Sequence, residues 1–178
     1  MRKHPVDAGH LLWRLPPHAT TRLSVCALDA LLAGQGGVNP LPARGIDIGT
    51  GSGVLAIVAA RLGVKQVVAL DIDPCARKEA ADNIALNDLS HSVVVFDGHL
   101  EAVTGPVSLV IANLRLPTLK RYAPRIEALV EPGGAMVFSG IRENEAPGLA
   151  QVYGAMGDCV WEKVEGGWCA MVFIRKPA

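Results

Sequence analysis

Residues 44–53 read Arg-Gly-Ile-Asp-Ile-Gly-Thr-Gly-Ser-Gly, and this stretch decides the fold. Its first half is a short apolar run, typical of a buried strand, and its second half brings three alternate glycines where the chain must turn. A small-residue helix is predicted next over 54–62, and residues 66–71 form a second apolar run. The order strand, glycine turn, helix, strand indicates a βαβ unit and therefore a parallel sheet.

The same alternation continues along the chain. Further helices are predicted over about 21–32, 74–86 and 118–129, and further strands over 93–97, 107–113 and 135–140. Two apolar runs, 159–164 and 168–174, flank Gly166-Gly167, which indicates a closing antiparallel hairpin. Because βαβ crossovers are right-handed, the predicted fold is α/β: a Rossmann-like doubly wound sheet, mostly parallel. We expect one domain over 1–178, with 1–20 as an N-terminal segment that could form a flap.

Composition narrows the class of protein. Hydrophobic residues make up 50% and aromatic residues 4% of the 178, so the core is expected to be aliphatic. Lys+Arg and Asp+Glu number 17 each, which disfavours a general nucleic-acid-coating protein. No uncharged apolar run reaches the ~18 residues of a membrane-spanning helix, and the first residues lack the apolar part of a secretory signal. We therefore predict a cytoplasmic protein without a membrane partner.

The four cysteines, Cys26, Cys75, Cys159 and Cys169, are scattered, without a C-x-x-C pair and without a His at metal-ligand spacing. This pattern favours small buried hydrophobic residues in a reducing compartment, and it predicts no metal site.

The glycine loop follows a carboxylate, Asp47. A dinucleotide would place its anionic pyrophosphate at this turn, where a carboxylate would repel it. The third glycine also stands too early for G-x-G-x-x-G, because residue 54 is Val. A nicotinamide dehydrogenase is therefore disfavoured, and a cationic ligand such as S-adenosylmethionine (SAM) is the better match. The alternative role of Asp47 is that of a turn cap.

Two further carboxylates end predicted strands. Asp71 stands 22 positions after Gly49, where an acidic residue reaches the ribose hydroxyls of an adenosine-containing ligand. Asp73 competes for this role, but its position before Pro74 indicates a helix cap. Asp97 could accept a hydrogen bond from an adenine amino group, and capping is its alternative role.

Residues 47–57 together with 68–74 resemble the class I SAM-dependent methyltransferases. More narrowly, the chain from about His18 onward resembles the catalytic domain of the bacterial ribosomal protein L11 methyltransferases. Four stretches carry this resemblance: 18–23, 110–114, 132–141, and Trp168-Cys169. The resemblance implies SAM as cofactor and a nitrogen of a protein or amine, ribosomal proteins included, as methyl acceptor.

Carried over residue by residue, the resemblance implies cofactor contacts at Thr21, Gly49, Asp71 and Asn113. Asp47, Gly51, Gly53 and Asp97 complete the candidate cofactor set. Thr21 would bring its hydroxyl near the methionine end of SAM; its alternative role is to cap the first helix, which Thr20 could do equally. Two departures stand out: we expect no counterpart of the family's N-terminal substrate-binding domain, and residues 13–17 read Trp-Arg-Leu-Pro-Pro where the family has Phe-Gly-Thr-Gly-Thr.

Asn113 is the candidate catalytic residue. Its amide oxygen could accept from an amine N–H and aim the nitrogen lone pair at the methyl group; its alternative role is that of a turn residue. Leu114-Arg115-Leu116 follows it without an aromatic residue, which favours an aliphatic amine over a planar substrate. His18, His99 and Asp97 are the candidates for a general base.

Beyond Asn113, four basic residues cluster: Arg115, Lys120, Arg121 and Arg125. They form either a solvated helix face or a surface for an anionic partner such as RNA. The sequence thus predicts a SAM-dependent methyltransferase acting on a protein or amine nitrogen. The alternatives are an RNA or small-molecule methyltransferase, and a SAM-binding module that needs a partner subunit. The sequence does not indicate an oligomeric state.

Overall fold

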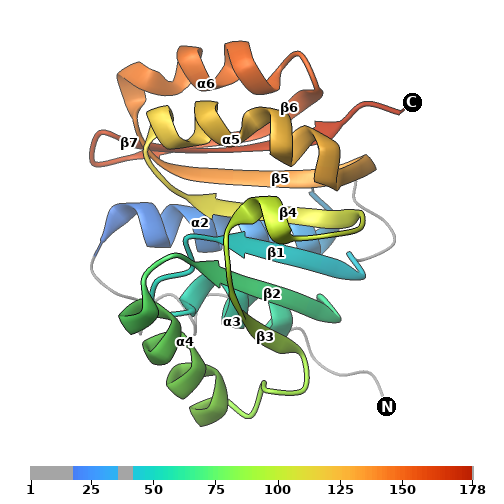
Figure 1. Ribbon diagram of the computed structural model, residues 1–178. Coiled ribbons are helices and arrows are strands. Elements are labelled where there is room, and N and C mark those ends of the chain that lie inside the picture. Colours follow the sequence, from blue (N-terminus) through green and yellow to red (C-terminus); the bar gives the residue numbers. More distant parts are fainter. Residues whose placement is uncertain (1–17, 36–41, 178) are drawn as a thin grey trace, which may run out of the picture.

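The computed structural model describes residues 18–35 and 42–177, and these fold around one seven-stranded sheet (Figure 1). The strand order is β3-β2-β1-β4-β5-β7-β6. β1 to β5 run parallel, and β7 runs antiparallel to both β5 and β6. The strands are β1 (Arg44–Ile48), β2 (Gln66–Asp71), β3 (Val93–Asp97), β4 (Val107–Asn113), β5 (Val130–Arg142), β6 (Gly157–Glu165) and β7 (Trp168–Arg175).

Helices cover both faces of the sheet, so the predicted doubly wound α/β fold is confirmed. The helices are α2 (Ala19–Ala30), α3 (Val54–Arg61), α4 (Pro74–Leu86), α5 (Leu116–Leu129) and α6 (Ala146–Tyr153). Short helical turns are η1 (Leu31–Gln35), η2 (Leu100–Ala102) and η3 (Glu143–Glu145). α2, α3 and α4 pack on one face, and α5 and α6 pack on the other. The chain reverses its direction of winding between β1 and β4, whose carboxyl ends lie at the left in Figure 1.

Most predicted elements match the structure, and two differ. β5 begins at Val130 rather than at residue 135, because Val130 pairs with Val107 before a bulge shifts the register. α6 was not predicted, since Pro147 and Gly148 within its eight residues obscure the helical pattern. Residues 13–17 and most of the predicted 1–20 segment lie outside the described residues.

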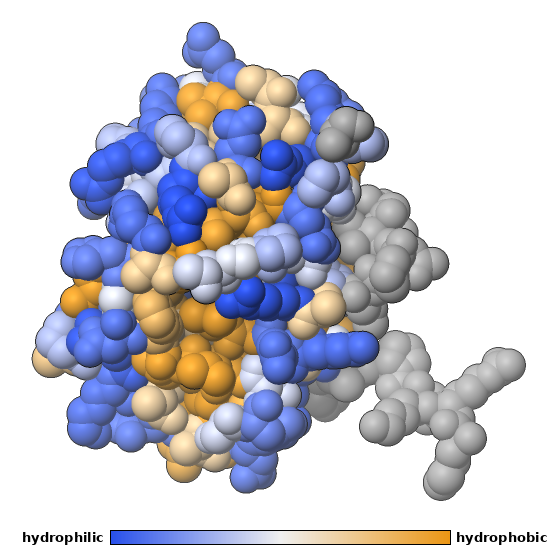
Figure 2. All heavy atoms as spheres, turned by 45° about the vertical axis from the view of Figure 1, so that its right-hand side comes forward, coloured by the Kyte–Doolittle hydropathy of each residue, from blue (hydrophilic) through white to orange (hydrophobic). Residues whose placement is uncertain are grey.

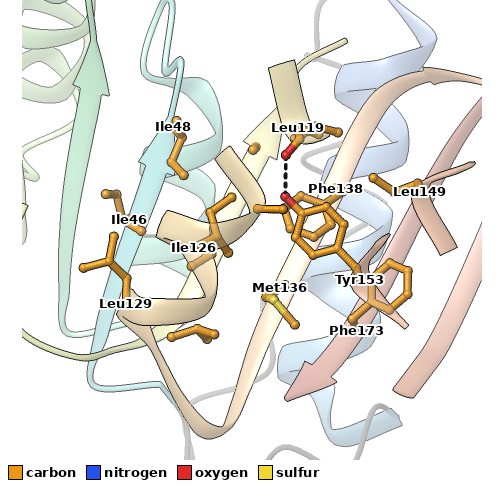
Figure 3. Close-up of a cluster of buried hydrophobic side chains, with 14 of the residues drawn as sticks. Ile46, Ile48, Leu119, Ile126, Leu129, Met136, Phe138, Leu149, Tyr153 and Phe173 are labelled. Atoms are coloured by element: carbon orange, nitrogen blue, oxygen red, sulfur yellow. Dashed lines mark hydrogen bonds between the residues drawn. The ribbon is translucent and has the colours of Figure 1, made fainter. Parts of the chain in front are cut away.

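An aromatic cluster fills the core beneath α6 (Figure 3). The centre of the Phe138 ring on β5 lies 4.2 Å from the centre of the Tyr153 ring and 6.2 Å from the centre of the Phe173 ring on β7. The buried Tyr153 hydroxyl donates to the carbonyl oxygen of Leu119 on α5, at 2.9 Å. Burial raises the pKa of Tyr153, so this hydroxyl stays protonated and remains a donor. The core is otherwise aliphatic, as predicted.

The outer surface is mixed. Figure 2 shows hydrophobic side chains gathered in the middle of the face that it views, with hydrophilic side chains around them. The large hydrophobic residues that are exposed in the described part of the chain are Ile72, Leu86, Val94, Val160 and Val164. None of the described helices is long and apolar enough to cross a membrane.

We expect Tyr153→Phe to lower the free energy of unfolding by about 1–2 kcal/mol, because it removes a buried hydrogen bond and leaves a carbonyl oxygen with one partner fewer. Urea denaturation at pH 7 measures the loss. The control is Tyr122→Phe, whose side chain is only half-buried and whose substitution should change stability by less than about 0.5 kcal/mol. Equal effects of the two substitutions would contradict the assignment.

Candidate active site

The three glycines of the loop after β1 all adopt positive φ, at 74° for Gly49, 55° for Gly51 and 82° for Gly53. A Cβ on Gly49 would lie 2.7 Å from the Leu114 side chain, and one on Gly53 would lie 3.2 Å from Ala80. A Cβ on Gly51 would meet no described atom within 4 Å. The first and third glycines thus allow close packing against β4 and α4, while the middle one faces open space.

Asp47 lies beneath this loop and is buried. Its Oδ2 accepts from the Thr50 hydroxyl at 2.6 Å and from the Ala56 N–H at 3.2 Å, which are hydrogen bonds of the turn-cap kind. Its Oδ1 is also buried and has no hydrogen-bond partner among the described residues. Burial is the main cause that raises the pKa of Asp47 to about 6.

Asp71 connects the end of β2 to the glycine loop. Its Oδ2 accepts from the Gly51 N–H at 2.9 Å, and its Oδ1 accepts from the Asp73 N–H at 3.0 Å. Asp73 itself caps α4 by accepting from the Cys75 N–H at 2.8 Å, so its predicted role as a helix cap is confirmed. A carboxylate oxygen can accept more than one hydrogen bond, so Asp71 can still bind a ligand.

A cleft of about 340 Å³ opens at the carboxyl ends of β1 and β2. Its walls are mainly apolar, with Asp71 as a carboxylate among them. The lining residues are Ile48, Gly49, Leu70, Asp71, Ile72, Leu100, Leu114, Thr118, Arg121 and Tyr122. Ile72, a large hydrophobic residue of this lining, is 67% exposed.

Arg77 joins the ends of β2 and β3, a role that the sequence analysis missed. Its guanidinium lies 2.7 Å from Asp97 and also donates to the carbonyl oxygens of Asp71 and Ile72, at 3.1 Å each. The Asp97 side chain is 80% exposed, so its second oxygen is open to solvent. Asp71 and Asp97 end different strands, and Ile72 directly follows β2, so no short-range sequence pattern could have indicated this arrangement.

Asn113 ends β4, and its neighbours come from α2. Its Nδ2 donates to the Thr20 hydroxyl oxygen at 3.2 Å, and that oxygen lies 2.8 Å from Nδ1 of His18. The structure thus brings Thr20 to Asn113. Thr21, the predicted cofactor contact, is half-buried in the first turn of α2. Oδ1 of Asn113 lies 2.7 Å from the position that a Cβ on Gly140 would take. Among the described residues, this oxygen has no hydrogen-bond donor.

A second cavity, of about 210 Å³, is lined by Gly140, the residue whose Cβ position approaches Asn113, and we call it the Trp168 pocket. The Arg142 guanidinium lies 3.8 Å from the centre of the Trp168 ring, and the His18 ring lies 5.4 Å from it. The pocket is lined by Arg115, Pro117, Gly140, Arg142, Glu145 and Trp168. Gly140 and Trp168 belong to the stretches that carry the family resemblance, and Arg115 belongs to the basic cluster; only the fold brings the three together.

The four basic residues beyond Asn113 differ in position and in their contacts. Arg115 lines the Trp168 pocket, and Arg121 lines the cleft. Arg125 donates to the carbonyl oxygens of Leu100, Glu101 and Val103, and so fastens α5 to the turn after β3. Lys120 is exposed. The cluster therefore does not act as one surface, because Arg125 has a structural partner set of its own.

All four cysteines are free. Cys169 is buried as predicted, but the prediction is wrong for Cys75 and Cys159, which are exposed because they lie in the first turn of α4 and on the edge strand β6. Within residues 18–35 and 42–177, no group of three or more His, Cys, Asp or Glu residues could hold a metal ion.

Comparison with known proteins places the chain in a family. The sequence model of the family "Ribosomal protein L11 methyltransferase (PrmA)" matches residues 17–176, which is nearly the whole chain. The chain belongs to the ribosomal protein L11 methyltransferase family. The resemblance inferred from the glycine loop and the Asn113 segment is thereby confirmed.

Relatives within the L11 methyltransferase family share the sequence at moderate identity. The chain is 40% identical over 156 residues to the ribosomal protein L11 methyltransferase of Pelotomaculum thermopropionicum, covering 86% of this chain and 48% of that protein. The one from Pelobacter propionicus is 39% identical over 160 residues, covering 89% of this chain and 51% of that protein. The chain thus spans about half the length of the curated relatives it matches.

Solved structures agree with this assignment to the L11 methyltransferase family. The ribosomal protein L11 methylase of Lactobacillus delbrueckii subsp. bulgaricus superposes with a TM-score of 0.79 at 28% identity, covering 89% of this chain and 80% of that one. An RNA methyltransferase from Salinibacter ruber, in complex with S-adenosyl-L-homocysteine, superposes with a TM-score of 0.69 at 17% identity, covering 92% and 95%. At that identity the second likeness shows a shared fold.

The raised pKa of Asp47 gives stability a pH dependence. The folded protein holds this proton more tightly than the unfolded chain, in which the pKa is near 3.8, so the free energy of unfolding should fall as pH rises from about 4 to about 6. The loss amounts to about 3 kcal/mol, at ~1.4 kcal/mol per pKa unit. The loss is complete by about pH 7, one unit above the folded pKa.

Asp47→Asn should remove this slope, because an amide does not titrate. Denaturation in urea at intervals from pH 4 to pH 7.5 measures it. The control is Asp82→Asn, an exposed carboxylate on α4, which should keep the slope of the wild-type protein. An Asp47→Asn protein that still loses stability over this range would show that other groups are responsible.

Proposed function

We propose that the protein is a SAM-dependent methyltransferase that methylates an amine nitrogen of a protein. The observation that carries this proposal is the setting of Asn113. Its Nδ2 donates to Thr20, its Oδ1 is left to accept, and the two residues that follow it, Leu114 and Arg115, line two different cavities. One cavity suits an adenosine-containing cofactor, and the other is open to a substrate. Membership of the L11 methyltransferase family supports the same reaction.

The described residues fit SAM as the cofactor. Ile72 and Leu100 offer apolar surface for an adenine ring, and Asp71 is placed to accept hydrogen bonds from the two ribose hydroxyls. Gly51 leaves open space in the loop. The buried Oδ1 of Asp47 lacks a donor, which suits a ligand that carries positive charge nearby. When bound, SAM supplies an electrophilic methyl group attached to a positively charged sulfur.

The remaining predicted cofactor residues shape the glycine loop or lie near the proposed cofactor site. Gly49 and Gly53 shape the loop, and their Cβ positions are blocked by neighbouring atoms. One oxygen of Asp97 is exposed, and Arg77 links Asp97 to Ile72, which lines the cleft. Asp97 can therefore accept a hydrogen bond from an adenine amino group. For Thr21 we retain a role near the methionine end of SAM, since it lies one residue from the Thr20–Asn113 hydrogen bond.

Asn113 would orient the substrate amine. Because its Nδ2 donates to Thr20, its Oδ1 is turned away from α2 and can accept from an amine N–H. One such hydrogen bond restricts the rotation of the amine and directs the nitrogen lone pair. Positioning of this kind is the main contribution that an enzyme can make to a displacement reaction. Thr20 acts here as a positioning residue.

His18 is the strongest of the three candidate bases. Its Nδ1 is bonded to Thr20, which places it two hydrogen bonds from Asn113. In the tautomer whose Nδ1–H donates to Thr20, Nε2 is the nitrogen that can take a proton. Asp97 is paired with Arg77. His99 precedes η2, whose Leu100 lines the cleft. A base near Asn113 is needed only to the extent that the amine arrives protonated.

A protein amine is the substrate class that we favour. The relatives are named for methylation of ribosomal protein L11, so a ribosomal protein in the cytoplasm is the first substrate to test. RNA has less support, since the basic cluster is divided among separate contacts. A partner subunit that delivers the substrate remains compatible with the site.

Asp71→Asn should weaken SAM binding by about tenfold, because it removes one charged hydrogen-bond acceptor for the ribose. The amide oxygen that remains can still accept from one of the two backbone N–H groups, that of Gly51 or that of Asp73. Isothermal calorimetry measures the affinity. Asp97→Asn serves as the matched comparison and should weaken binding less, because its carboxylate is exposed. Unchanged binding in Asp71→Asn would place the ribose acceptor elsewhere.

With methyl-labelled SAM and fractionated bacterial lysate, label should enter material that protease removes and RNase does not. Asn113→Ala should lower the rate of labelling tenfold or more, equivalent to about 1.4 kcal/mol, while SAM affinity changes far less. Thr20→Val should lower the rate in the same direction, and Thr20→Ser, which retains the hydroxyl, should not. RNase-sensitive label, or labelling by Asn113→Ala within twofold of wild type, would refute the proposal.

A further inference from the structure

The Trp168 pocket adjoins the catalytic position. Gly140 lines this pocket, and a Cβ on it would lie 2.7 Å from Oδ1 of Asn113 and 2.8 Å from the backbone of Leu114. Leu114 in turn lines the cleft on the other side. A group that fills the Trp168 pocket would therefore lie next to the amine that Asn113 holds.

The pocket carries an unneutralised positive charge. Arg115 and Arg142 contribute two guanidinium groups, and Glu145 contributes one carboxylate. Among the described residues, neither guanidinium has a carboxylate within 4.0 Å, whereas Arg77 is paired with Asp97. Glu145 uses its Oε2 to accept from the backbone N–H of Arg142, at 2.8 Å, and so holds the chain rather than the guanidinium.

Arg142 is ordered before any ligand arrives. Its guanidinium stacks on the Trp168 ring at 3.8 Å, and the two residues are paired neighbours on β5 and β7. The His18 ring contacts Trp168 as well. Stacking leaves the edge of a guanidinium, with its N–H donors, available to a ligand. A group that binds there loses less free energy to the ordering of Arg142 than it would at a mobile side chain.

These features select an anion. An ammonium group in this pocket would face two like charges, while a carboxylate can take two parallel N–H donors from a guanidinium. Resting on the proposed function, we propose that the Trp168 pocket binds a carboxylate of the substrate protein, from an acidic residue beside the methylated amine. Arg115 and Arg142 are its ligands. The enzyme thereby selects lysines or terminal amines that have an acidic neighbour.

Binding is tested without catalysis, using two capped peptides that differ in one residue, Gly-Lys-Asp-Gly and Gly-Lys-Asn-Gly. The probe is the indole N–H resonance of Trp168, identified by its loss in Trp168→Phe. The acidic peptide should shift this resonance and bind at least about tenfold more tightly than the amide peptide. Arg115→Gln and Arg142→Gln should each remove most of this preference. Arg142→Lys, which retains charge but loses the planar fork, should fall between.

The control variant is Lys78→Gln, which removes a positive charge from the exposed face of α4 and should keep the full preference. Equal affinities of the two peptides in the wild-type protein would overturn the proposal, as would a preference that survives both arginine substitutions. A short RNA that shifts the Trp168 resonance through Arg142 while the acidic peptide does not would also overturn it, in favour of a phosphate site.

The proposed function is tested separately by SAM calorimetry and methyl transfer to both peptides. If both peptides are methylated equally and bind equally, the enzyme is a methyltransferase without this carboxylate site. If the acidic peptide binds through the arginines and SAM does not bind, the pocket stands and the proposed function fails.

Discussion

The end of β4 is held between two glycines, and the site depends on this close approach. Gly49, after β1, and Gly140, on β5, both adopt positive φ, and a Cβ on either would come within 2.7 Å of Leu114 or Asn113. Only residues without a side chain fit there at no conformational cost. The two glycines also line the two cavities, Gly49 the cleft and Gly140 the Trp168 pocket, so the end of β4 lies close to both.

Polar contacts at the carboxyl ends of the strands link the glycine loop, β2 and β3 to one another. Asp71 bonds the glycine loop to the end of β2, and Arg77 bonds β2 to β3. Asp47 lies beneath the loop with one oxygen unpaired, an arrangement that costs free energy. The two packed faces of the sheet supply stability that offsets this cost, and the loop keeps a fixed shape.

The sequence was most informative where chemistry and local structure coincide. The glycines of residues 49–53, the cap at Asp73 and the apolar runs of β2, β3 and β4 each obey short-range rules, and their elements were predicted within a residue or two. Arg77, Thr20 and the Trp168 pocket were missed because their partners come from distant parts of the chain. The choice between Thr20 and Thr21 depends on the rotation of α2 about its axis, which its packing on β5 and β7 determines.

The strand order has a consequence for biosynthesis. β6 pairs only with β7, which is made after it, and β7 lies between β5 and β6. The early helix α2 contacts this same late region, through His18 with Trp168 and Arg22 with Glu165. Thr20 and Asn113 are therefore both translated before β7, the strand on which α2 packs. A chain that has been translated only as far as β6 has the glycine loop and Asn113 but lacks Trp168 and the pocket that this residue lines.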